Sequence, residues 1–64
     1  MMINFLVVDD VMANVEILEL IIDDYMEEKK IEEDMYAIFR AKNGQEAVDL
    51  AVSNHFDLIF LDIM

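Results

Sequence analysis

Two short apolar runs predict strands that are buried on both faces. Ile3 to Val8 is continuous, rich in β-branched residues and followed by two aspartates. Leu58 to Leu61 is a second such run, and it is also followed by an aspartate. Uninterrupted apolar runs of this length are typical of strands inside a parallel sheet, because helices cover both faces of such a sheet.

The spacing of apolar residues after the first run indicates a helix that begins near Met12. Apolar residues recur at steps of three and four, as on one face of a helix: Val11, Val15, Leu18, Ile22 and Tyr25, with Ile17 and Ile21 beside them. Acidic residues occupy the other side, and no proline or glycine interrupts the pattern. The acidic stretch from Asp23 to Asp34 then predicts a solvated helix end and a surface loop.

The next segments predict a second strand and a second helix. Tyr36 to Lys42 alternates loosely, and its two basic residues favour the edge of a sheet over its centre. Asn43-Gly44 predicts a turn. A short helix is then expected from Gln45 to Ser53, with these residues as its apolar side: Ala47, Val48, Ala51 and Val52.

The resulting order, β-α-β-α-β, predicts an α/β fold with a parallel sheet and right-handed crossovers. The first and third strands should be neighbours, which gives the strand order 2-1-3. A sheet of this kind would leave Leu58 to Leu61 with an open apolar edge. Such an edge is expected to pair with something, since exposed strand edges are templates for association.

Composition narrows the class of protein. The 64 residues allow one small domain at most, which would be marginally stable alone, and there is no cysteine for disulfides or thiolate metal sites. The net charge of −11, with only four basic residues, argues against binding to nucleic acid or to an anionic membrane surface. No signal peptide is evident, and no apolar run approaches the roughly 18 residues of a membrane span. We therefore expect a cytoplasmic protein.

Carboxylates at the strand ends suggest a metal and phosphate site. Ligands of doubly wound sheets bind beyond the carboxyl ends of the strands, where the strand order reverses. Asp9 and Asp10 follow the first strand and Asp62 follows the third. Three neighbouring carboxylates repel each other, and a bound Mg²⁺ would relieve that repulsion. An aspartate in such a site can also attack a phosphoryl group and form an acyl phosphate.

Three segments, in order along the whole chain, resemble the receiver domain of two-component response regulators. Val7-Val8-Asp9-Asp10, followed by Asn14, looks like the start of that domain. The stretch from Ala41 to Ala47 is similar to the family's A-x-N-G-x-E-A segment. Asp57 to Met64 is similar to its D-L-I-x-x-D-I-M stretch. The resemblance implies a partial flavodoxin-like fold, with residues 1–64 as the N-terminal portion of the domain.

The resemblance also implies roles for individual residues. Asp62 would be the phosphoacceptor. Mg²⁺ would be held by Asp9, Asp10 and Asp62, together with the backbone carbonyl of Met64. The phosphoryl donor would be a sensor histidine kinase or a phosphotransfer protein, and the only enzymatic activity expected is slow self-dephosphorylation. His55, the only histidine, is expected to lie exposed in a loop.

The chain also departs from the family, and a second interpretation stays open. Receiver domains carry a Ser or Thr after the fourth strand and a Lys after the fifth, and neither is present here. The alternative is a non-catalytic half-domain that self-associates, as a homodimer, or binds a partner through the edge of the third strand.

Overall fold

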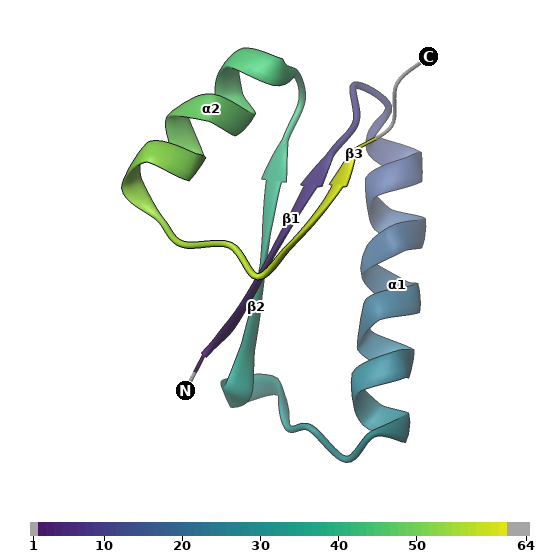
Figure 1. Cartoon of the computed structure of the whole chain (residues 1–64). Coiled ribbons are helices and arrows are strands. Elements are labelled where there is room, and N and C mark those ends of the chain that lie inside the picture. The colour runs from purple at the N-terminus through teal and green to yellow at the C-terminus, as the bar shows by residue number, and fades with distance from the viewer. Residues whose placement is uncertain (1, 62–64) are drawn as a thin grey trace.

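The computed structural model describes residues 2–61, and its elements alternate between strand and helix. In chain order these are β1 (Ile3–Val8), α1 (Met12–Glu28), the short 3-10 helix η1 (Glu33–Met35), β2 (Tyr36–Ala41), α2 (Gly44–Ser53) and β3 (Leu58–Leu61). The predicted β-α-β-α-β order is confirmed. In Figure 1 the sheet forms a central layer, with α1 on one side of it and α2 on the other.

The three strands are parallel and lie in the order β2-β1-β3, as predicted. β1 pairs with β2 from Ile3 opposite Tyr36 to Val8 opposite Ala41. It pairs with β3 over a shorter length, which ends at Val8 opposite Leu61. β2 is thus an edge strand, which agrees with the prediction from its basic residues, although only Arg40 lies within it and Lys42 follows its end. β3 is the other edge strand of the described sheet.

β1 forms the centre of two small cores, one on each face of the sheet. Side chains of a strand alternate between faces. Phe5 and Val7 therefore point toward α1, while Leu6 and Val8 point toward α2. All four are buried, which explains why this run lacks the alternation of a strand with one wet face.

Helix α1 covers the first core with a narrower stripe than the sequence pattern suggested. Val15, Ile22 and Met26 are its buried residues. Tyr25, which we expected on the buried face, is 53% exposed, and Met26 takes its place against the core. Val11 is also half-exposed, as are Ile17 and Ile21 beside the stripe. The apolar residues of α1 therefore extend beyond the sheet surface that the helix covers.

Helix α2 begins at Gly44, because Asn43 caps it instead of forming an isolated turn. The Asn43 side chain accepts a hydrogen bond from the backbone N–H of Glu46 at 2.8 Å, and the Glu46 carboxylate accepts one from the backbone N–H of Lys42 at 2.9 Å. The pair of bonds resembles a capping box, except that Glu46 accepts from Lys42, the residue before the cap.

The inner side of α2 differs from the predicted one. Ala47 and Leu50 pack against the second core, whereas Val48 is 57% exposed and Val52 is 82% exposed. Ala51 is exposed as well. The prediction was therefore right for Ala47 and wrong for the other three residues of that side. Phe39 of β2 and Phe56 of the α2–β3 loop pack edge to face and share this core with Ala47 and Leu50.

The acidic stretch after residue 23 divides into a helix end and a loop, as expected. α1 ends at Glu28, and Lys30 adopts a left-handed conformation with φ of 62°. The backbone N–H of Ile31 then donates to the carbonyl of Met26 at 2.9 Å. This closure resembles a Schellman motif and returns Ile31 to the first core.

Candidate functional site

Asp9 lies at the carboxyl end of β1, where the sequence predicted a site. Its backbone N–H donates to the carbonyl of Ala41 at 3.1 Å, so the β1–β2 pairing continues to this residue. Its side chain is buried, and one carboxylate oxygen accepts a hydrogen bond from the backbone N–H of Val11 at 2.9 Å. That bond closes an Asx turn, which holds the carboxylate in place between the strand and the start of α1.

Asp10 follows immediately and is exposed to solvent. It lies between the end of β1 and the first turn of α1, whose cap position, Val11, has no side-chain hydrogen bond. The N-terminus of a helix presents backbone N–H groups and a partial positive charge. This edge of the sheet therefore combines two carboxylates, which attract cations, with a helix end, which attracts anions.

The other two predicted site residues, Asp62 and Met64, lie outside the described residues. The last described residue of β3, Leu61, is paired with Val8, which directly precedes Asp9. Within residues 2–61, no group of three or more His, Cys, Asp or Glu side chains is arranged so that it could hold a metal ion. The structure thus brings Asp9 and Asp10 together at the predicted edge and leaves the rest of the predicted site as a prediction.

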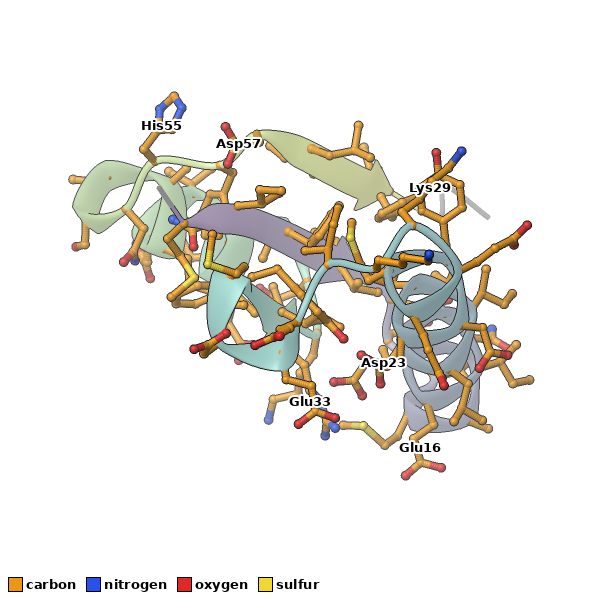
Figure 2. The ribbon with its side chains drawn as sticks, turned by 90° about the horizontal axis from the view of Figure 1, so that it is seen from below. Glu16, Asp23, Lys29, Glu33, His55 and Asp57 are labelled. Carbon is orange, nitrogen blue, oxygen red and sulfur yellow. The ribbon has the colours of Figure 1, made fainter. Side chains whose placement is uncertain are left out.

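His55 is exposed in a loop, as predicted, and Asn14 lies at the start of α1. Asn14 is exposed on the first turn of α1, and its backbone N–H donates to the carbonyl of Val11 at 3.0 Å. The ring of His55 is exposed in the α2–β3 loop, with Nε2 3.6 Å from a carboxylate oxygen of Asp57 (Figure 2). Asp57 in turn accepts a hydrogen bond from the backbone N–H of Asn4. These contacts attach the loop to the start of β1.

A second polar feature, which the sequence did not predict, lies near the opposite end of the sheet. The Tyr36 hydroxyl donates to the Asp23 carboxylate at 2.6 Å. Asp23 of α1 and Glu33 of η1 border the same space between α1 and β2 (Figure 2). A cavity of about 550 Å³ opens there, with mostly acidic and polar lining: Asp23, Glu27, Lys30, Ile31, Glu32, Glu33 and Tyr36.

The acidic residues around Tyr36 raise the pKa of its hydroxyl. The hydrogen bond to Asp23 is the main reason that the pKa of Tyr36 is raised to about 12. Burial adds to the effect, and so do the negative charges of Asp23, Glu33 and Glu27. Tyr36 is therefore a neutral hydrogen-bond donor at physiological pH. Its contact with Asp23 connects α1 to β2 and is structural.

A scan against protein-family models found no match, and neither the curated proteins nor the solved structures contain a protein that matches this chain. Neither α1 nor any other helix within residues 2–61 has the length and apolar character to cross a membrane.

Proposed function

We propose that this chain is the N-terminal portion of a response-regulator receiver domain, and that it accepts a phosphoryl group at Asp62 in a Mg²⁺-dependent reaction. One observation carries the proposal. β1 and β3 are parallel neighbours whose last described pair is Val8 and Leu61, and each of these residues is followed in the sequence by an aspartate. Doubly wound folds bind ligands beyond the carboxyl ends of the strands, at the point where the strand order reverses, and β1 and β3 flank that point here.

The residues at the end of β1 suit a hard cation. Mg²⁺ prefers oxygen ligands, commonly one or two carboxylates together with phosphate oxygens and water. Asp9 and Asp10 supply two carboxylates, and the bond from Val11 orients the first. In this proposal the backbone carbonyl of Met64 adds a further oxygen ligand, as the resemblance implies. The bound ion would offset negative charge on the oxygens of the transferring group.

The proposed reaction is phosphoryl transfer from a phosphohistidine. A carboxylate oxygen of Asp62 forms a bond to phosphorus, and the phosphorus–nitrogen bond of the donor breaks. The electron pair of that bond stays on the imidazole nitrogen. The donor would be a sensor histidine kinase or a phosphotransfer protein. The product is an acyl phosphate on Asp62, which water hydrolyses slowly.

Intact-mass spectrometry tests this proposal directly. The chain is incubated with Mg²⁺ and a small acyl-phosphate donor, and its mass is measured beside those of three variants. We expect one phosphoryl adduct on the native chain, none on Asp62→Asn, and a strongly reduced yield for Asp10→Asn. Asp49→Asn is the matched control, because it removes an exposed carboxylate of α2, away from the strand ends.

The Asp49→Asn control and the omission of Mg²⁺ show whether the adduct is specific. Asp49→Asn should be phosphorylated as fully as the native chain. Omission of Mg²⁺, with a chelator present, should abolish the adduct in both. An adduct that persists in Asp62→Asn, or that forms equally well without Mg²⁺, would contradict the proposal.

A further inference from the structure

A set of three hydrogen bonds joins the start of β3 to β1. The backbone N–H of Asn4 donates to Oδ2 of Asp57 at 2.8 Å, and the backbone N–H of Asp57 donates to the carbonyl of Asn4 at 2.9 Å. The third bond runs from Nδ2 of Asn4 to the carbonyl of His55 at 2.8 Å. We call these three bonds the Asn4–Asp57 clamp. The clamp directly precedes the first pair of the β1–β3 ladder, which is Phe5 opposite Leu58.

The apolar pattern of β3 does not fix its register against β1. Side chains of a strand alternate between the two faces of a sheet, so a slip of one residue exchanges the faces. Where polar and apolar residues alternate, such a slip puts polar side chains into the core. All four residues of β3 are apolar, however, and so are the four residues of β1 opposite them. Phe60 packs against the first core, and a slip would replace it with Ile59 or Leu61, which are also apolar.

The clamp does distinguish between registers. A slip of one residue moves a strand by about 3.3 Å along its neighbour, which takes the Asp57 carboxylate out of hydrogen-bond reach of the Asn4 N–H. Phe56 or Leu58 would then lie opposite Asn4, and neither side chain has a hydrogen-bond acceptor. The three bonds therefore favour the observed register over both neighbouring ones.

We propose that the Asn4–Asp57 clamp positions Asp62 for phosphorylation, because it sets the register of β3 and Asp62 directly follows that strand in the sequence. This inference rests on the proposed function, to which it adds a positioning residue. Asp57 acts through the strand that it begins and takes no part in the chemistry.

Register matters for the proposed reaction because the site combines residues from two strands. The last described pair is Val8 and Leu61, and an aspartate follows each of them in the sequence. A slip of one residue would move the end of β3 by about 3.3 Å along β1 and exchange its faces. Misplacement of a reacting group by even about 1 Å can lower a rate about 100-fold. Loss of the clamp should therefore slow phosphorylation although every proposed site residue is kept.

Three variants of the full chain test the clamp. Asp57→Ala removes the side-chain acceptor, whereas Asp57→Asn keeps an oxygen that can accept the bond from the Asn4 N–H. Asp49→Ala is the matched control. Asp49 is also exposed, and its carboxylate accepts a hydrogen bond at 3.0 Å from Gln45 of the same helix, α2. Far-UV circular dichroism checks that each variant keeps its helices.

NMR spectroscopy tests the register without any phosphorylation. Cross-strand nuclear Overhauser effects in the native chain should follow the pattern that places Val7 opposite Phe60. In Asp57→Ala we expect a second pattern, shifted by one residue, and about tenfold faster hydrogen exchange of the Asn4 amide. Asp57→Asn and Asp49→Ala should show the native pattern alone. If Asp57→Ala also showed only the native pattern, the clamp would not set the register and the proposal would be wrong.

The rate of adduct formation measures the consequence for phosphorylation. With saturating Mg²⁺ and a small acyl-phosphate donor, the initial rate should fall at least about tenfold in Asp57→Ala and stay within about twofold of the native rate in the other two variants. The measurement is repeated in trimethylamine N-oxide, which favours folded chains. The deficit of Asp57→Ala should persist there. A deficit that disappeared would come from partial unfolding alone and would overturn the proposal.

The same rates separate failure of this inference from failure of the proposed function. No adduct on the native chain would contradict the proposed function. An adduct that forms as fast on Asp57→Ala as on the native chain would contradict the role of the clamp and leave the proposed function intact.

Discussion

Helix α1 makes different contacts with the two strands that flank β1. Toward β2, α1 sends polar side chains that have partners: Glu19 forms an ion pair with Arg40, and Asp23 accepts the hydrogen bond of Tyr36. Toward β3 it presents apolar side chains that are more than half exposed: Ile17, Ile21 and Tyr25. β2 is paired along six residues of β1 and β3 along four. One flank of α1 is therefore closed and the other is open.

The difference divides α1 into a flank whose polar groups are paired and a flank whose apolar groups are exposed. On the closed flank, Glu19 and Asp23 of α1 have partners on β2. On the open flank, apolar groups of α1 remain exposed within residues 2–61. The buried stripe between the two flanks, formed by Val15, Ile22 and Met26, supports both.

The sharpest way to test this division is to truncate adjacent residues of α1. Ile22 is 4% exposed in the core, and Ile21 is 57% exposed on the open flank. Ile22→Ala should lower the free energy of unfolding by about 2–5 kcal/mol, because it removes buried surface and leaves a cavity. Ile21→Ala should change it by less than about 0.5 kcal/mol. Urea unfolding followed by circular dichroism measures both values.

A milder variant guards against complete unfolding of this small chain. Ile22→Val should cost about 0.5–1.5 kcal/mol and keep the unfolding transition measurable. If truncation of Ile21 destabilised the chain as much as truncation of Ile22, the open flank would be part of the core and the comparison would be wrong.

The strands, and the strand order, could be predicted from the sequence because continuous apolar runs and short links leave few arrangements. The sequence was a poorer guide to which side of each helix packs against the sheet. Apolar residues cover so much of α1 that periodicity alone does not decide between Tyr25 and Met26 for the core. That choice depends on how the helix is rotated over β1, which is a tertiary property.

The candidate site shows the same limit. The position of Asp9 at the end of β1 could be predicted, because the apolar run stops there. Its hydrogen bond from the backbone N–H of Val11 joins residues only two positions apart and closes a local turn. The contact between Asp23 and Tyr36 had no such signal. The two residues are thirteen positions apart, and they meet only because the chain between them folds so that α1 lies beside the start of β2. The contribution of Asp62 remains a prediction.

The Tyr36 contact predicts that stability falls at high pH. Below the ordinary tyrosine pKa of 10.0, Tyr36 keeps its proton in the folded and the unfolded chain, and the stabilising bond is fully present. Between pH 10 and about 12, the unfolded chain loses this proton first, so the free energy of unfolding declines as pH rises. Tyr36→Phe should remove this part of the pH dependence. Below pH 10 it should cost less than about 1 kcal/mol, because the bond is exposed.

Tyr25→Phe is the matched control, since it removes a phenolic hydroxyl from the open flank. It should retain the decline in urea midpoint between pH 10 and about 12, because the Tyr36–Asp23 bond is untouched. If the decline in urea midpoint persisted in Tyr36→Phe and disappeared in Tyr25→Phe, the pH-sensitive group would be Tyr25, and the prediction would be wrong.

The ion pair between Glu19 and Arg40 should have the smallest effect, although it lies on the closed flank. The Glu19 side chain is 18% exposed and that of Arg40 is 50% exposed, so solvent and salt screen their attraction. Glu19→Gln should therefore cost only about 0.2–1 kcal/mol in urea unfolding, and the cost should shrink further in high salt. A double-mutant cycle with Arg40→Gln isolates the coupling between the two groups. A coupling as large as the effect of Ile22→Ala would mean that polar contacts, and not the buried stripe, provide the main stability of the closed flank.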